Sequence, residues 1–389
     1  MKTLTVIDSS VAFDPPRPAS VAGLYVHVPF CFHKCHYCDF YSITRQTPAR
    51  MSAFVDRLLV EADGYAGLGV DTIFFGGGTP SLLPLDDMRQ LLVGLGERLD
   101  LSAVREWTVE VNPATADGTY LRMMRDHGVD RVSFGAQSFD RDDLANLERH
   151  HDPDDVPRSV ELARSAGYER WSIDLIYAVP GQTLASWERT LAAALELRPR
   201  HLSCYGLTYE PNTPLGVRQR LGQVDAAEES LELQMLWHTR RTLTDAGLPP
   251  YEISNYAAPG HESLHNLHYW HGENYIGLGP SAASHVDGTR WRNAPHIGKW
   301  ERGIDTVGHA AIDAERLDRD ARASERTWLA LRTAAGLCWD ELDLRHSHAD
   351  TIDMLTKRGL LVADEDGMRL TDTGIPLADA IAAEFFGDD

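Results

Sequence analysis

The sequence predicts an α/β protein made of six consecutive β/α units around a parallel sheet, followed by a small winged-helix-like domain. From Gly23 onward, short apolar runs rich in β-branched and aromatic residues alternate with longer stretches whose apolar residues recur every three to four positions. Such alternation of strands and helices indicates a parallel sheet. A chain of 389 residues with 43% hydrophobic content is long enough for one large core and a second, smaller one.

Each apolar run ends in a polar or glycine-containing turn, the end of the strand at which α/β barrels place their chemistry. The expected strands are Leu24–Val28, Thr72–Phe75, Trp107–Val111, Arg131–Phe134, Trp171–Ile176 and His201–Tyr205. The expected helices are Ala49–Gly64, Leu85–Leu95, Asp154–Ala166, Leu184–Leu195 and Ala226–Ala246.

The sequence pattern divides the chain into four segments. Residues 1–20 are a leader, residues 21–250 carry the β/α units, residues 251–310 are a His-rich, aromatic loop region, and residues 311–389 form the C-terminal domain. We expect the loop region to be irregular but packed, because its composition is not that of a disordered segment.

Helical periodicity marks two stretches of the C-terminal segment, Ser324–Ala335 and Asp350–Arg358, and Leu360–Leu370 predicts two strands joined by a turn. Helices followed by a hairpin indicate a winged-helix-like unit. Its acidity favours a protein contact or a lid over DNA binding.

The formal charge of −21 argues against nucleic acid as a partner, because phosphate binding depends on clustered Lys and Arg. It also opposes general adhesion to anionic lipid. The first residues lack the pattern of a signal peptide, and no segment approaches the roughly 18 apolar residues of a membrane span. We therefore expect a cytoplasmic protein.

Three of the five cysteines, Cys31, Cys35 and Cys38, fall in one loop directly after the first expected strand. Thiols this close suit a metal centre in a reducing compartment better than a disulfide framework. Cys204 and Cys338 stand alone, and we expect them to be small buried residues in a strand and a helix. Because an ordinary 4Fe–4S cluster takes four cysteines, three predict a cluster with one iron open to an outside ligand.

A zinc ion is the alternative, with His27, His33 or His36 as its fourth ligand, and cysteines of purely structural role are another. Zinc sites usually combine two cysteine pairs, and the sequence contains no second pair. The spacing Cys-x3-Cys-x2-Cys therefore favours the iron–sulfur cluster.

Glycines and polar residues follow the next expected strands. Residues 74–80 place three glycines where a backbone can approach a ligand without Cβ interference, although a tight β/α turn would also explain them. Glu110 ends the third strand, where it would hold a ribose hydroxyl or an ammonium group, and Gln137 follows the fourth. Asp174 lies in an apolar run, and a buried carboxylate is costly unless paired. We expect Arg149 to pair with Asp174 or with a carboxylate of the ligand.

The cysteine spacing, with an aromatic residue before the last cysteine, resembles the motif of the radical S-adenosylmethionine (SAM) superfamily. The ordered pattern as a whole resembles the oxygen-independent coproporphyrinogen III oxidase family. The segments that carry this resemblance are Tyr25–Cys31, Cys38–Phe40, Gly76–Ser81, Glu110–Pro113, Gly135–Phe139 and Asp174–Gly181.

The resemblance implies a partial (β/α)6 radical SAM barrel, with a small C-terminal domain over its mouth. It implies a 4Fe–4S cluster on Cys31, Cys35 and Cys38, whose open iron binds SAM. The residues that match SAM-contacting positions of the family are Tyr25, Tyr37, Gly77, Gly78, Thr79, Glu110, Gln137, Arg149, Asp174 and Thr208.

The chain departs from the oxidases of that family in two respects, since Phe40 stands where they have a further cysteine and the leader before the first strand is short. Residues 265–270, His-Asn-Leu-His-Tyr-Trp, are similar to a motif of the heme chaperone subgroup. That resemblance implies heme as a ligand, with His265 as axial ligand and Tyr269 and Trp270 against the porphyrin. Imidazole ligates heme iron, and aromatic faces suit the macrocycle.

An alternative remains for this stretch, in which its histidines only make hydrogen bonds within a loop beside an aromatic cluster. The histidines concerned are His261, His265, His268 and His271.

We therefore predict a heme chaperone that binds heme and hands it to apoproteins, membrane-bound respiratory enzymes among them. The cluster and SAM are then structural, regulatory or redox parts, and catalytic turnover is not required. Such a protein would be cytoplasmic and would reach the membrane through a partner, and the resemblance is compatible with a homodimer.

The runner-up hypothesis is a radical SAM enzyme of porphyrin biosynthesis that oxidatively decarboxylates coproporphyrinogen III. Its substrate carries four carboxylates, so its site should gather Arg or Lys, to which Arg290 and Arg292 would contribute. A third hypothesis is a radical SAM enzyme that acts on an unrelated substrate.

Overall fold

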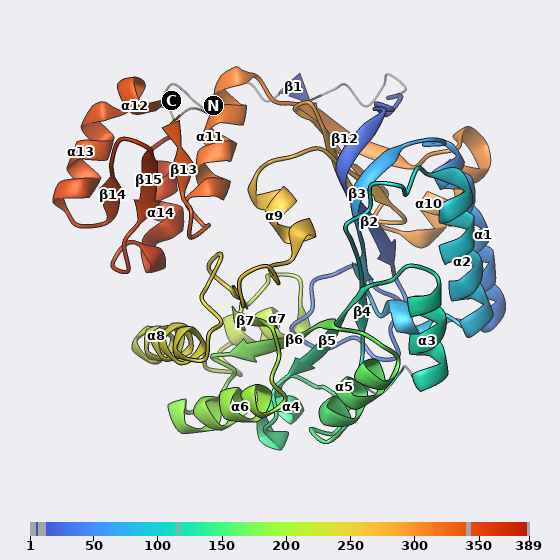
Figure 1. The fold of residues 1–389 in the computed structure, drawn as a ribbon, viewed down its shortest axis with the longest axis horizontal. Helices are drawn as coiled ribbons and strands as arrows, with labels where there is room; N and C mark the ends of the chain where they lie inside the picture. Colours follow the sequence, from blue (N-terminus) through green and yellow to red (C-terminus); the bar gives the residue numbers. More distant parts are fainter. Residues whose placement is uncertain (1–4, 7–12, 114, 116, 340–343, 387–389) are drawn as a thin grey trace.

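The computed structural model describes residues 5–6, 13–113, 115, 117–339 and 344–386, and its centre is a parallel sheet curved into an open barrel (Figure 1). The parallel strands follow one another in chain order, β2 (Ser20–Val28), β3 (Gly69–Gly77), β4 (Glu106–Val111), β5 (Arg131–Gln137), β6 (Arg170–Tyr177) and β7 (His201–Gly206). Each contains one strand that the sequence predicts. The expected α/β class with six β/α units is confirmed.

Helices lie between these strands and after the last of them, and most of them cover the outer face of the sheet. They are α1 (Pro48–Asp63), η1 (Pro80–Leu82), α2 (Leu85–Arg98), α3 (Gly118–Asp126), α4 (Arg141–Asn146), α5 (Asp155–Ser165), α6 (Leu184–Glu196), α7 (Pro214–Arg220) and α8 (Glu229–Asp245). Local signals begin several of them: Asp117 accepts from two backbone N–H groups of α3, and Thr183 with Ser186 forms a capping box at α6. Among the described helices, none is long and apolar enough to cross a membrane.

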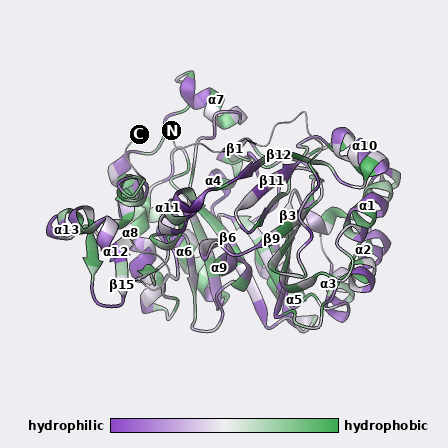
Figure 2. Ribbon diagram, turned by 90° about the horizontal axis from the view of Figure 1, so that it is seen from above, coloured by the Kyte–Doolittle hydropathy of each residue, from purple (hydrophilic) through white to green (hydrophobic). Residues whose placement is uncertain are grey.

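Residues of each strand alternate between the helical layer and the lumen of the barrel. Along β2, Leu24 and Val26 are fully buried in one core with Phe54 of α1, whereas Tyr25 and His27 between them line the lumen. Figure 2 shows hydrophobic residues along central strands and both hydrophobic and hydrophilic stretches on the outer helices, as expected for helices with one face on the core. The lumen wall therefore carries polar side chains on which a site can be built.

The central strands are part of a 12-stranded sheet that ends at β8 on one side and at β1 on the other, so the barrel stays open. β7 pairs with antiparallel β8 (Asn255–Ala257). β2 pairs with β9 (Tyr275–Leu278), after which come β10 (Ala283–Val286), β11 (Thr289–Asn293), β12 (Ala311–Arg316) and β1 (Thr5–Val6).

The expectation of an irregular loop region over residues 251–310 is wrong. This segment holds strands β8 to β11 and helices α9 (Leu264–Trp270) and α10 (Ile297–Val307). Its strands are too short to show a periodicity in the sequence, and their partners set their conformation.

The C-terminal domain has its own core and lies beside the barrel (Figure 1). Its elements are α11 (Arg319–Ala330), β13 (Leu337–Cys338), α12 (Leu344–Ser347), α13 (Ala349–Lys357), β14 (Leu361–Ala363), β15 (Gly367–Leu370), η3 (Ile375–Leu377) and α14 (Ala378–Ala383). The helices and the hairpin agree with the predicted winged-helix-like pattern.

Two details of this region differ from expectation. Because β12 pairs with β11 in the large sheet, the domain begins at α11 and not at residue 311. Cys204 is buried in β7 as expected, but Cys338 is exposed in β13, where the strand is only two residues long and leaves the side chain uncovered.

Candidate functional site

The cysteine loop follows β2 and is closed at its base by backbone hydrogen bonds. The Cys31 N–H donates to Ile43 O (3.0 Å), and the Ile43 N–H donates to Pro29 O (2.7 Å). Within the loop, the Cys38 N–H donates to Cys35 O (3.1 Å). The backbone therefore fixes all three cysteines against one end of the barrel.

The three thiols lie close enough to affect one another's pKa, in a site where Cys35 is buried and the other two cysteines are partly buried. Burial raises the pKa of Cys31, and it raises the pKa of Cys38 to about 11, with the neighbouring thiols adding to both effects. Thr79 Oγ1 donates to Cys31 Sγ (3.8 Å), and Arg149 Nη1 donates to Cys35 Sγ (3.7 Å). Thiolates that repel one another in a partly dry site require positive charge, which the irons of a cluster supply. The residues present fit a 4Fe–4S cluster.

The zinc alternative has no support in the part of the chain that the structure describes. No group of three or more His, Cys, Asp or Glu side chains there is arranged to hold one metal ion. The three candidate histidines have other partners: His33 and His36 face Glu148 (3.3 and 2.9 Å), and His27 Nε2 donates to Tyr41 O (2.8 Å). A cluster needs no such convergence, because each cysteine binds a different iron.

The glycine turn at the end of β3 packs against the cysteine loop. Gly77 has a φ of 100°, and a Cβ there would lie 2.4 Å from the His27 ring. A Cβ on Gly78 would lie 2.6 Å from Phe30 O. Both glycines are thus required by close contact within the chain, in addition to lining the cavity described below.

Two carboxylates line the lumen, Glu110 from β4 and Asp174 from β6, with β5 between these strands. Burial, and after it the nearby Asp174, raise the pKa of Glu110 to about 8. Burial also raises the pKa of Asp174, although Ser133 Oγ donates to it (2.8 Å). Within the described residues, neither acid forms an ion pair. A cationic ligand, or one rich in hydroxyl groups, would meet this need.

Arg149 and Gln137 lie at the end of β5. Arg149 does not pair with Asp174 as expected, because its Nη2 donates to Gly135 O and its Nη1 to Cys35 Sγ. Its Nε is buried and has no partner within the described residues. Gln137 has a φ of 67° beyond a bulge in β5, and such strain recurs at ligand sites.

One cavity of about 1250 Å³ collects the cysteines and every residue expected to contact SAM. The expected residues on its wall are Cys31, Cys35, Cys38, Tyr25, Tyr37, Gly77, Gly78, Thr79, Glu110, Gln137, Arg149, Asp174 and Thr208. Sequence reasoning missed Glu148 and His151, which also line it. Neither belongs to a motif, and their closeness to Arg149 in the chain was the one available signal.

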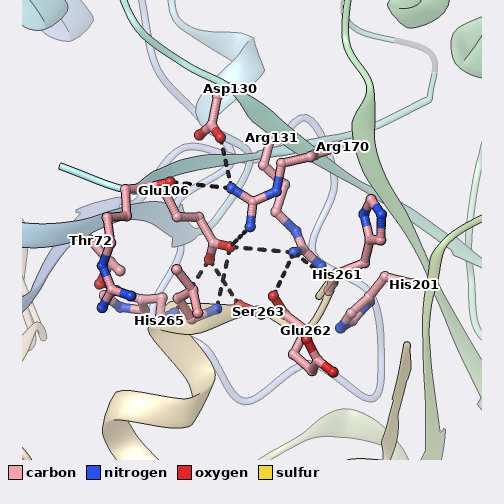
Figure 3. A network of polar contacts seen from close by, with 12 residues as sticks. Thr72, Glu106, Asp130, Arg131, Arg170, His201, His261, Glu262, Ser263 and His265 are labelled. Carbon is pink, nitrogen blue, oxygen red and sulfur yellow. Dashed lines mark hydrogen bonds and ion pairs between the residues drawn. The ribbon is translucent and has the colours of Figure 1, made fainter. Parts of the chain in front are cut away.

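Helix α9 closes the opposite end of the lumen, at the first residues of the strands. Glu106 begins β4 and is fully buried. Its carboxylate accepts from Ser263 Oγ (3.2 Å) and from the N–H groups of Leu264 and His265 (3.3 Å each) in the first turn of α9 (Figure 3). A carboxylate at a helix N-terminus stabilises the helix and here fixes its position.

Two arginines complete this anchor (Figure 3). Arg170 Nη2 lies 2.6 Å and Arg131 Nη1 lies 3.4 Å from Glu106 Oε2, and Arg170 also contacts Asp130 (2.8 Å). Sequence reasoning missed this network. The sequence feature that could have indicated this network is a charged residue at the first position of three neighbouring strands, β4, β5 and β6.

His265 is buried in α9 with both ring nitrogens engaged. Thr72 Oγ1 donates to Ala22 O (3.0 Å), so it must accept from His265 Nδ1–H at 2.8 Å. Burial lowers the pKa of His265 to about 3, so the ring is neutral. Nε2 therefore carries a lone pair, which accepts from Tyr269 OH (3.2 Å). The ring stacks on Phe74, with centroids 5.3 Å apart.

The rest of the motif divides between the cavity and its surroundings. Tyr269 lines the large cavity, whereas Trp270 does not. The Trp270 carbonyl accepts from Arg326 Nη1 (2.9 Å), and His268 Nε2 lies 2.8 Å from Asp71.

The fold and the cysteine site define a radical SAM protein. Residues 25–194 match the model of the Radical SAM superfamily, and residues 317–377 match that of the HemN C-terminal domain. The solved structure of coproporphyrinogen III oxidase (HemN) from Escherichia coli is similar, with a TM-score of 0.83 at 25% identity over 95% of this chain and 91% of that one. The superfamily implies a 4Fe–4S cluster and SAM as cofactors.

Relatives of known function identify a smaller family within this superfamily. The heme chaperone HemW of Lactococcus lactis is 32% identical over 94% of this chain and 97% of its own. The HemW of Escherichia coli is 41% identical over 68% of this chain and 70% of its own. The HemW of Mycobacterium tuberculosis is 32% identical over 96% of each chain. The chain belongs to the family of HemW heme chaperones.

The two arginines considered for an oxidase site lie in ion pairs away from the cavity wall. Arg290 forms ion pairs with Glu315 and Glu325, and Arg292 pairs with Asp313 (2.6 Å). Neither arginine lines the large cavity. The residues considered for a four-carboxylate substrate are therefore already paired elsewhere.

Proposed function

We propose that this protein binds heme at α9 and transfers it to apoproteins, with the cluster and SAM held at the other end of the same lumen. The observation that carries the proposal is the state of His265, a neutral imidazole on the cavity wall whose Nε2 lone pair meets the Tyr269 hydroxyl and no other group among the described residues.

His265 already has the arrangement typical of a metal ligand. A ligating imidazole usually donates its other ring N–H to a fixed acceptor, which sets the tautomer. Thr72 provides that acceptor at 2.8 Å, and Glu106 fixes the backbone of the helix. Axial ligation through Nε2 then costs the 3.2 Å contact with Tyr269, whose ring offers aromatic surface on the same cavity wall. Trp270 would meet the porphyrin where it extends beyond the cavity.

Cys31, Cys35 and Cys38 are proposed to hold the cluster, and a bound SAM would receive one electron from it when the cluster is reduced. The chain itself positions the cofactor. Glu110 and Asp174 provide carboxylates for its cationic or hydroxyl groups. The wall is completed by Tyr25, Tyr37, Gly77, Gly78, Thr79, Gln137, Arg149 and Thr208.

The recipients we propose are apo-hemoproteins, membrane-bound respiratory enzymes among them. A chain with a formal charge of −21 would meet such partners through a local surface and not through general adhesion to anionic lipid.

Anaerobic reconstitution with iron and sulfide, followed by separate incubations with heme and with coproporphyrinogen III plus SAM and reductant, tests the proposal. We expect a stable heme absorbance band that is lost in His265→Ala and kept in the matched control His271→Ala. His271 follows α9 and is half exposed. Joint appearance of protoporphyrinogen and 5′-deoxyadenosine would refute the chaperone and establish the oxidase.

A further inference from the structure

A second cavity, of about 360 Å³, lies where the strands beyond β9 meet the C-terminal domain, next to the end of α9. Four arginines, one at the end of β12 and three on α11, line it. They are Arg316, Arg319, Arg322 and Arg326. We call this cavity the arginine pocket. It shares no residue with the large cavity of the barrel.

Most of the positive charge in the arginine pocket is not neutralised. Within the described part of the chain, the guanidinium groups of Arg316, Arg319 and Arg322 form no ion pair and no hydrogen bond. In a chain with 58 Asp and Glu against 37 Lys and Arg, three neighbouring arginines without a carboxylate partner indicate a place for an external anion.

The acids of the pocket wall are engaged elsewhere. Glu325 pairs with Arg290, and Asp287 accepts from Asn274 Nδ2 (3.0 Å). His285 on the same wall is buried, and this burial lowers its pKa.

The pocket adjoins the heme motif directly. Gly272, two residues beyond Trp270, is part of its wall, and Arg326 Nη1 donates to the Trp270 carbonyl (2.9 Å). Ring contacts also run from α9 to the wall, with centroids 4.6 Å apart for Tyr269 and Tyr275 and 6.0 Å apart for Tyr275 and His285.

We infer that the arginine pocket binds the propionate carboxylates of the heme held at α9, an inference that rests on the proposed function. Guanidinium groups match carboxylates in a planar, two-bonded geometry. The pocket volume, at the small end of ligand sites, suits the acidic arms of a larger ligand. The macrocycle would lie outside it, against the motif.

The pocket also places heme at the junction of the two domains. Arg319, Arg322 and Arg326 belong to α11, the first helix of the C-terminal domain (Figure 1). Heme bound there would contact both domains at once.

Hemin and hemin dimethyl ester, whose propionates carry no charge, distinguish the inference from its alternatives. Both are titrated by absorbance into the full-length wild type, into Arg319→Gln/Arg322→Gln, and into the control Arg241→Gln/Arg302→Gln. The control replaces exposed arginines of α8 and α10. We expect the wild type and the control to prefer hemin by at least about tenfold, the scale of a charge-assisted hydrogen bond. The pocket variant should lose this preference through weaker hemin binding, with its affinity for the ester unchanged.

Equal affinity of the wild type for hemin and ester, or a preference that survives in the pocket variant, would overturn the inference while the proposed function stands. Failure of the wild type to bind either porphyrin would remove both. Inorganic phosphate serves as the third probe. Stabilisation of the wild type alone by phosphate, without any effect of esterification, would assign the pocket to a free anion and overturn its assignment to heme.

Discussion

The two ends of the barrel lumen are built in opposite ways. At the carboxyl ends of the strands, Glu110 and Asp174 have no ion-pair partner among the described residues, and Arg149 Nε is buried without an acceptor. At the amino ends, Glu106 meets two arginines and three further donors, and both ring nitrogens of His265 have partners.

Buried polar groups are normally satisfied, and exceptions call for an explanation. At the first end, the proposed cofactors would supply the missing charges and donors. At the second, Glu106 and both ring nitrogens of His265 have partners without a ligand, and this histidine is held in a set tautomer. We conclude that the cofactor end depends on loading and that the α9 end is a rigid platform, and the predictions below test this contrast.

The largest effect should follow from removing one cluster ligand. In Cys35→Ser we expect complete loss of the iron–sulfur absorbance after reconstitution, because the chain offers no substitute thiol within the loop. Heme binding should change little, since α9 is anchored independently at the other end. Iron content, sulfide content and a heme titration measure this, and the buried Cys204→Ser is the control. Parallel loss of heme binding would show that the two ends are coupled.

The next effect is on stability. Replacing Glu106 by Gln leaves the buried Arg131 without its carboxylate and weakens the cap of α9, so we expect a loss of about 3 kcal/mol in the free energy of unfolding. Urea denaturation measures it. The control Asp130→Asn removes a partly exposed contact with Arg170 and should cost no more than about 1 kcal/mol. Similar costs for the two variants would contradict an anchoring role of Glu106.

The same contrast explains what the sequence could predict. Side chains at the carboxyl ends of parallel strands share one edge of a sheet, so Cys31, Glu110 and Asp174 could be placed together from strand positions alone. Alternation along β2 likewise places Tyr25 on the lumen side. Local sequence patterns are sufficient to predict these positions, because each residue lies in, or directly after, a strand that the sequence itself reveals.

The amino-terminal end could not be foreseen in this way. Glu106 meets Ser263 across 157 residues, and that contact depends on where α9 docks. The strands β9 to β11 owe their conformation to their neighbours and leave no periodic trace. Arg149 lies on the wall of the cavity with the other predicted residues, but its acceptors, Gly135 O and Cys35 Sγ, depend on the fold of the loop.

The third prediction concerns pH at the cofactor end. Below its pKa of about 8, Glu110 is protonated, and a cationic ligand favours the carboxylate, so SAM binding should release a proton. Affinity for SAM should then rise with pH until it levels off above about 8, by up to about 25-fold between pH 6.5 and 8.5. Equilibrium binding across this range measures it, with Glu110→Gln as control. The wild type and the variant are compared by the slope of the logarithm of SAM affinity against pH. The difference between the two slopes is the contribution of Glu110. Identical slopes would mean that Glu110 does not face the bound cofactor.

The smallest expected effect tests the platform itself. Thr72→Val keeps the shape of a fully buried side chain but removes the acceptor for His265 Nδ1–H, so the tautomer is no longer fixed. Loss of such a partner should weaken heme binding about tenfold, the lower end of the range for groups that orient a metal ligand. Thr72→Ser restores the hydroxyl and should restore the affinity. Heme titration by absorbance measures both variants, and circular dichroism checks that each is folded. A folded Thr72→Val that binds heme like the wild type would show that ligation does not use Nε2 of a His265 held by Thr72, and His265 would then be a structural residue of α9.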